Sequence, residues 1–87
     1  MQIYKGKTGL NKTWQEPFGE TIPCQKCGKE AKIMFVACEG DEDEGNFICN
    51  LHQTTSEKGG LWFHDSVSVA VYACPFCLEV TALANQA

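Results

Sequence analysis

Residues 66–73 show the most regular alternation of side-chain character in the chain. Val67, Val69 and Val71 alternate there with serine, alanine and tyrosine. Successive side chains of a strand point to opposite faces of its sheet, so the three valines share one face. Residues 31–38 are mostly apolar, contain β-compatible residues and have the length of a strand. Both segments are predicted to be strands.

Two further segments complete the expected sheet. After residues 31–38 the chain runs through an acidic stretch with glycines, residues 39–46, and apolar residues resume at 47–51. This order predicts a β-hairpin with a long, solvated acidic tip. The acidic run does not have the ligand spacing of a calcium-binding EF-hand loop. Side chains alternate again from 78 to 84, which favours a last strand over a short helix.

Residues 1–22 are predicted to be an irregular arm packed on the core of a domain formed by residues 23–87. Glycine and proline recur along the arm and interrupt any helix. A core this small is short of apolar cover. We therefore expect the widely spaced apolar residues of the arm to fold back over it: Tyr4, Leu10, Trp14 and Phe18.

The chain has 87 residues, six of which are cysteine. A domain of this size buries only about 60–65% of its unfolded surface, and it usually gains stability from disulfides, a metal or oligomerisation. The N-terminal sequence has no apolar run like that of a signal peptide. No segment approaches the roughly 18 apolar residues of a membrane helix. We therefore expect a cytoplasmic protein with no membrane segment, whose cysteines stay reduced and bind metal.

Four of the cysteines form two C-x-x-C pairs: Cys24 with Cys27, and Cys74 with Cys77. Structural zinc takes four ligands in a tetrahedron, and a C-x-x-C turn brings two thiolates together from one short loop. Gly28 suits the left-handed backbone that such a turn often requires, and Pro75 presets the second turn. One pair alone would suit a thioredoxin-like redox site, but the helix of such a site is not predicted. The two pairs together predict one structural zinc ion.

With these pairs and the strands beside them, the chain resembles the zinc-ribbon family. The resemblance is carried by Cys24-Gln25-Lys26-Cys27-Gly28 and Cys74-Pro75-Phe76-Cys77, and it covers the ligand frame rather than the whole chain. It implies a mainly β, small zinc-ribbon-like domain of antiparallel hairpins, in which two metal knuckles hold one zinc. The long stretch between the pairs leaves room for an inserted hairpin. Rubredoxins share the knuckles but bind iron, and the second pair here lacks the glycine that commonly follows theirs.

The remaining metal-capable residues are four in number, enough for a possible second zinc site: Cys38, Cys49, His52 and His64. If they form a separate site, Cys38 and Cys49 face each other across the acidic hairpin, remote from the first site. If there is only one site, these two cysteines are small buried apolar residues, as free cysteine often is. The sequence leaves both arrangements open, so one zinc ion is expected and two are possible.

A third arrangement follows from a regular spacing. The patterns C-x-x-C, C-x-x-H and C-x-x-C begin at Cys24, Cys49 and Cys74, at intervals of 25 residues. In a cross-braced protein the first pair would bind zinc together with Cys49 and His52. The second pair would then complete its site with one of the two remaining ligands.

Charge and composition bear on the partner. The formal net charge is −4, and all seven basic residues are lysine. Nucleic-acid-binding proteins usually show a basic surface and use arginine to bind bases and phosphates. Direct nucleic-acid binding is therefore not expected, although Lys26, Lys29 and Lys32 lie close together in the sequence.

The sequence predicts a zinc-binding structural module that mediates protein–protein interaction. A zinc ion with four thiolate ligands leaves no coordination position for water, and no nucleophile with an adjacent base stands out. No catalytic residue is therefore assigned. Two alternatives remain: a nucleic-acid-associated ribbon accessory protein, and a redox or iron-binding rubredoxin-like protein.

Overall fold

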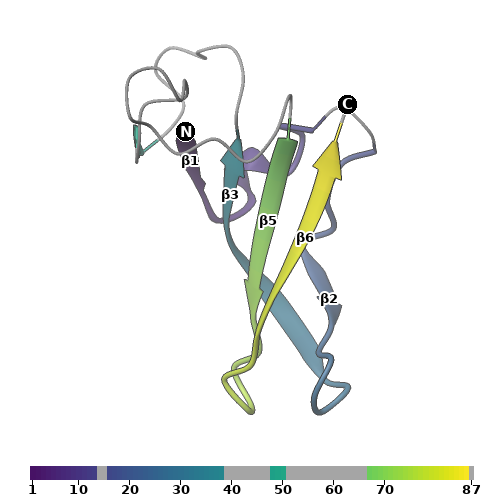
Figure 1. Cartoon of the computed structure of the whole chain (residues 1–87). Coiled ribbons are helices and arrows are strands. Elements are labelled where there is room, and N and C mark those ends of the chain that lie inside the picture. Colours follow the sequence, from purple (N-terminus) through teal and green to yellow (C-terminus); the bar gives the residue numbers. More distant parts are fainter. Residues whose placement is uncertain (14–15, 39–47, 51–66, 87) are drawn as a thin grey trace.

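The computed structural model of the chain describes residues 1–13, 16–38, 48–50 and 67–86. These residues form a six-stranded antiparallel sheet and one short 3-10 helix, η1 (Gly6–Gly9) (Figure 1). The strands are β1 (Gln2–Lys5), β2 (Thr21–Pro23), β3 (Glu30–Cys38), β4 (Cys49–Asn50), β5 (Val67–Ala73) and β6 (Val80–Gln86). In the described part of the chain, no helix is long and apolar enough to cross a membrane.

The predicted strands at 31–38 and 66–73 are confirmed as β3 and β5, and the last segment is a strand rather than a helix. The sheet order is β4-β1-β3-β5-β6. The register of β3 against β5 shifts between Ile33 and Phe35. On its other side β3 pairs first with β2 and then with β1. β3 is therefore the strand that connects the two ends of the sheet.

The hairpin predicted across the acidic stretch is wrong. β4 lies within the segment that was expected to pair with β3, but β1 lies between them, and Gln2 is the partner of both Cys38 and Asn50. The prediction assumed that strands adjacent in the sequence are adjacent in the sheet. The N-terminal segment instead supplies a strand, Gln-Ile-Tyr-Lys, whose isoleucine and tyrosine suit a sheet. The acidic residues 39–47 lie outside the described residues.

The core lies on one face of the sheet. On β5, Ser68, Ala70 and Tyr72 are fully buried on that face. On the opposite face Val67 is buried as well, but Val69 and Val71 are only half-buried. The predicted alternation is present, but the valine face is the more exposed of the two. The Tyr72 ring is fully buried in the core, and its hydroxyl donates a 2.6 Å hydrogen bond to the backbone carbonyl of Gly19 in the N-terminal segment.

The N-terminal segment covers this core. Tyr4 and Phe18 are part of it and Leu10 packs against it, while Trp14 lies outside the described residues. The segment is not irregular throughout, as had been expected, because it contains β1, η1 and β2. The division of the chain at residue 22 remains a prediction.

Gly9 is held against the buried side chains of Tyr4 and Val36. A β-carbon at Gly9 would lie 2.5 Å from the β-carbon of Tyr4 and 2.9 Å from that of Val36. Both neighbours are fixed to strands of the sheet, so the backbone would have to shift. We predict that Gly9→Ala lowers the free energy of unfolding by about 1–3 kcal/mol, as measured by chemical denaturation.

Gly6→Asn is the matched control in the same helix. No atom lies within 4 Å of a β-carbon at Gly6, and asparagine tolerates the positive φ of 51° found there. A loss of stability as large as that of Gly9→Ala would contradict the explanation by close packing.

Candidate metal centre

Two turns of the same construction lie at the end of the molecule opposite to both termini (Figure 1). Residues 24–29 connect β2 to β3, and residues 74–79 connect β5 to β6. In each turn the N–H of the first cysteine donates to the carbonyl five residues later, at 2.7 and 2.9 Å. The carbonyl of the same cysteine accepts from the N–H four residues later, at 3.0 and 2.9 Å. The backbone therefore places both C-x-x-C pairs in equivalent positions.

The residue after each pair adopts a left-handed backbone. φ is 76° at Gly28 and 66° at Leu78. The first value was expected for a glycine, but Leu78 was not expected to share it. Alignment of the two turns, C-x-x-C-G with C-x-x-C-L, is the signal that identifies this position in the sequence.

The four cysteine sulfurs form one compact cluster. The Sγ atoms of Cys24, Cys27, Cys74 and Cys77 all lie within 4.8 Å of one another. Two contacts cross between the turns, from Cys24 to Cys77 and from Cys27 to Cys74, each at 3.5 Å. Four sulfurs at about 2.3 Å from a central tetrahedral ion would lie about 3.8 Å apart. The cluster is therefore the right size to hold a metal ion.

The cluster is continuous with the hydrophobic core. Cys24 and Cys74 are buried members of the core, and Cys77 packs against it. Cys27 is exposed. All four cysteines are free thiols rather than disulfides. A metal bound here would therefore connect two ligands in the core, Cys24 and Cys74, to the exposed Cys27.

Hydrogen bonds favour the thiolate form of two of these cysteines. The backbone N–H groups of Cys27 and Lys26 lower the pKa of Cys24 to about 6, although burial opposes them. The Lys26 N–H donates to the Cys24 sulfur at 3.4 Å. At Cys74, burial raises the pKa. The N–H groups of Cys77 and Phe76, together with the neighbouring thiols, lower the pKa by more than burial raises it. The pKa of Cys74 is therefore also below its ordinary value.

The thiol form is favoured at Cys77, in contrast to Cys24 and Cys74. The backbone N–H of Glu79 lowers the pKa of Cys77, but burial and the three neighbouring cysteines raise it to about 12. Negative charge on the nearby sulfurs disfavours a further thiolate. Four thiolates in this space require a bound cation, and metal binding would release the remaining protons.

A ring contact joins the two turns beside the cluster. The ammonium nitrogen of Lys29, from the first turn, lies 4.7 Å from the centre of the Phe76 ring, from the second turn. Such cation–π contacts are worth about 0.5–1 kcal/mol at exposed sites, and Phe76 is exposed. The contact supports the alignment of the turns, but the sulfur cluster carries the chemistry.

The other proposed ligands are not brought together. β1 lies between Cys38 and Cys49, whose sheet partners are Gln2 and Ile3 respectively. Adjacent residues of a strand point to opposite faces, so the two cysteines lie on opposite faces of the sheet. Cys38 is buried and accepts a hydrogen bond from the Ser68 hydroxyl at 3.3 Å, while Cys49 is exposed.

The described residues therefore do not bring these two cysteines together, and the second site stays a prediction. The cross-braced arrangement is wrong, because Cys24 and Cys27 cluster with Cys74 and Cys77 rather than with Cys49. The two histidines that were predicted as further ligands, His52 and His64, lie outside the described residues. The C-x-x-C pairs form the one group of potential ligands found in the part of the chain that the structure describes.

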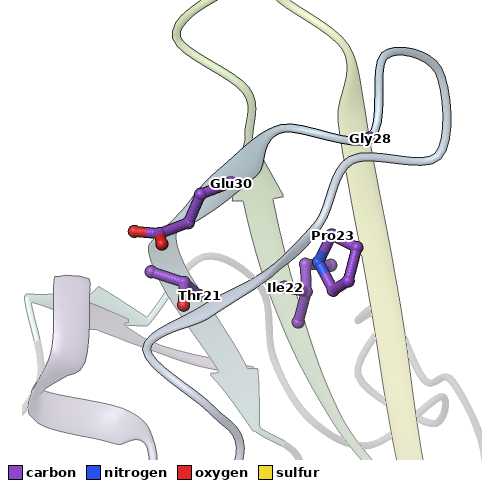
Figure 2. Close-up of a pocket in the computed structure, with 5 residues that line it drawn as sticks. All are labelled: Thr21, Ile22, Pro23, Gly28 and Glu30. Atoms are coloured by element: carbon purple, nitrogen blue, oxygen red, sulfur yellow. The ribbon is translucent and has the colours of Figure 1, made fainter.

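A shallow pocket of about 380 Å³ lies beside the first turn, lined by Thr21, Ile22, Pro23, Gly28 and Glu30. Figure 2 shows Glu30 on the same side as Thr21, with the apolar side chains of Ile22 and Pro23 apart from them. The lining contains one carboxylate and one hydroxyl but no imidazole or thiol.

Comparisons of the chain with protein-family models, with curated proteins and with solved structures find no match. The chain's own residues therefore carry the evidence for its function.

We predict that substitutions at the two left-handed positions have opposite effects. A side chain costs about 1–2 kcal/mol in the left-handed region, and Leu78 is 80% exposed, so its side chain gains little from burial. Leu78→Gly should leave the metal-loaded protein equally stable or about 0.5 kcal/mol more stable, after the larger unfolded-state entropy of glycine. Gly28→Ala should destabilise it by about 1 kcal/mol. Denaturant unfolding measures both, and a similar loss in the two variants would contradict the equivalence of the turns.

We also predict that acidification removes the metal. An unfolded thiol has a pKa of about 8.5, and the folded protein lowers the pKa of Cys24 to about 6. The stability from this depressed pKa is present above the unfolded value and is lost as the pH falls through the folded value. Protons also compete with the metal for the sulfurs.

For the chain loaded with zinc, we expect release of the ion between about pH 8 and pH 4, detected with a chromogenic chelator, together with loss of the β-sheet circular dichroism signal. Full retention of zinc by an unfolded chain, or an unchanged fold after complete zinc release, would contradict this account.

Proposed function

We propose that the chain is a zinc-binding structural module of the zinc-ribbon type, whose two turns act as zinc knuckles. The observation that carries the proposal is the cluster of four cysteine sulfurs within 4.8 Å of one another. A tetrahedral set of four sulfur ligands is typical of zinc or iron–sulfur sites. Cys24, Cys27, Cys74 and Cys77 would be the ligands. The ion would supply the positive charge that these thiolates need in so small a space.

Zinc is the metal that we favour over iron. Thiolates bind both, and the two metals accept the same tetrahedral arrangement. The left-handed position after the second pair is a leucine, Leu78, where rubredoxins commonly carry glycine. A purified protein that is colourless and contains zinc supports this proposal, whereas a red protein that contains iron would contradict it.

The proposed role is structural, and the proposed biological task is interaction with another protein. A zinc ion with four sulfur ligands has no open position at which to activate water. The chain is acidic and lacks arginine, which favours a protein partner over nucleic acid. Large apolar side chains are exposed near the second turn, including Phe76, Leu78 and Val80. Such a group of side chains on a small module is typical of a contact surface.

We predict that Cys24→Ser abolishes zinc binding and unfolds the domain. Structural zinc contributes about 10–16 kcal/mol of apparent binding free energy at neutral pH, which equals or exceeds the whole stability of most small domains. Cys49→Ser is the matched control, because Cys49 is an exposed cysteine outside the cluster. Elemental analysis and circular dichroism should show one zinc and a folded sheet for the control, and neither for Cys24→Ser.

Thiol titration separates this site from its alternatives. With zinc bound, the exposed Cys49 should react at once and the buried Cys38 only on unfolding, while the four ligands stay protected. Two zinc ions per chain, or a folded Cys24→Ser variant without metal, would contradict the proposal of a single structural site.

A further inference from the structure

β6 is an edge strand without the usual protection. β5 lies on one side of it, and the sheet has no strand on the other side among the described residues (Figure 1). Its sequence, Val-Thr-Ala-Leu-Ala-Asn-Gln, contains no charge and no proline, and its register with β5 is continuous from end to end. Charges, prolines and bulges are the devices that normally prevent an exposed edge from pairing with another strand.

The register shows which backbone groups point outward. Cys74 N–H donates to the carbonyl of Glu79, so these two residues form a hydrogen-bonded pair. Hydrogen-bonded and non-hydrogen-bonded pairs alternate along an antiparallel ladder. In the same register Val80, Ala82 and Ala84 occupy non-hydrogen-bonded pairs with β5. Their N–H and C=O groups therefore point toward the free edge. Among the described residues, no backbone–backbone hydrogen bond joins β6 to a segment other than β5. The N-terminal segment contacts the strand through a side chain, because the Asn85 amide donates to the Thr13 hydroxyl at 3.0 Å and to the Glu16 carbonyl at 3.5 Å.

The side chains along this edge are apolar and exposed. Val80 is 58% and Leu83 is 40% exposed, and Ala82 and Ala84 are exposed as well. Leu83 lies opposite Ala70 on the core face, at the outer margin of the core. An added strand would cover Leu83 and extend the core by one strand.

The pattern of β6 is symmetric about Leu83. Alanines flank it at 82 and 84, and short polar residues follow at 81 and 85. In two antiparallel copies centred on Leu83, Ala82 lies opposite Ala84 of the second copy, Thr81 lies opposite Asn85, and leucine lies opposite leucine. The outward N–H and C=O groups of Ala82 and Ala84 then form a hydrogen-bonded pair. This self-complementarity identifies a second copy of the chain as the partner, rather than an arbitrary peptide.

Charge supports the same partner. Two copies of an acidic chain repel each other, and like charges directly opposite one another destabilise a strand pair. β6 carries no charge, so pairing there brings no like charges into contact. The β2 edge is different, because β2 contains Pro23 and the surface beside it is lined by Lys7, Glu20, Glu30 and Lys32.

We propose that β6 pairs antiparallel with β6 of a second copy about a two-fold axis at Leu83, which joins the two sheets into one. This proposal rests on the proposed metal site only in that zinc would hold β6 in place. Zinc content is therefore measured on every sample. An unsubstituted chain that holds zinc but forms no dimer contradicts the edge pairing, whereas an unsubstituted chain that holds no zinc contradicts the metal site.

Analytical ultracentrifugation of the zinc-loaded chain tests the proposal, and a concentration-dependent dimer is expected. Ala84→Pro removes an outward N–H, and proline is tolerated at such an edge position. Leu83→Lys places two like charges opposite each other at the axis. Each variant should raise the dimer dissociation constant about tenfold or more. Met34→Lys is the matched control at an exposed apolar residue of β3, and it should leave the dimer unchanged.

A cysteine placed on the axis tests the register. In a Cys49→Ser background, Leu83→Cys should form a disulfide with its own copy on mild oxidation, because residues opposite each other in a non-hydrogen-bonded pair lie close enough. Thr81→Cys should not, since Thr81 lies opposite Asn85. A zinc-loaded monomer at all concentrations would overturn the proposal. So would a dimer that survives both Ala84→Pro and Leu83→Lys, because its interface must then lie on another surface, such as the valine face of β5.

Discussion

The approach of four thiols between two turns is the interaction on which the rest of the structure depends. The β3–β5 ladder ends at the pair of Lys32 with Ala73. Beyond it the two hairpins separate, and their turns are brought back together by the cysteine cluster and by the contact of Lys29 with Phe76. The neighbouring cysteines disfavour the thiolate form of Cys77, as its raised pKa shows. A divalent ion bound between the four sulfurs would replace this repulsion with attraction, in a domain too small for a large core.

The ligand cluster was predictable from the sequence because its geometry is local. Each C-x-x-C pair sits in a turn of a few residues, and adjoining strands of clear alternation bring the two turns to the same end of the molecule. The four cysteines in the cluster are those that the spacing identified. The ion itself, its identity and its number per chain remain predictions.

The sheet order was not predictable in the same way, because it depends on long-range pairing. Insertion of β1 between β3 and β4 joins residues far apart in the sequence. The residues of a short strand do not specify which other strands it pairs with. That insertion separates Cys38 from Cys49, which the sequence had placed face to face. The left-handed Leu78 was missed for another reason: residue preference favours glycine there, and the constraint of the turn overrides it.

The metal end and the free edge of the sheet are physically connected through β6. The second turn leads directly into this strand, so an ion that fixes the turn also fixes the row of outward backbone groups on which self-association would depend. Val69 and Val71 of β5 are only half-buried, and Val80 and Leu83 of β6 are exposed, so apolar surface remains uncovered on these strands. If a metal holds the domain together, as we propose, such surface can stay available for contacts, because stability would not depend on burying it.

X-ray absorption spectroscopy of the purified, metal-loaded chain tests the central claim most directly. We expect zinc with four sulfur neighbours at about 2.3 Å and no nitrogen or oxygen neighbour. A spectrum that requires nitrogen or oxygen in the first shell, or that shows fewer than four sulfurs, would contradict the four-cysteine centre.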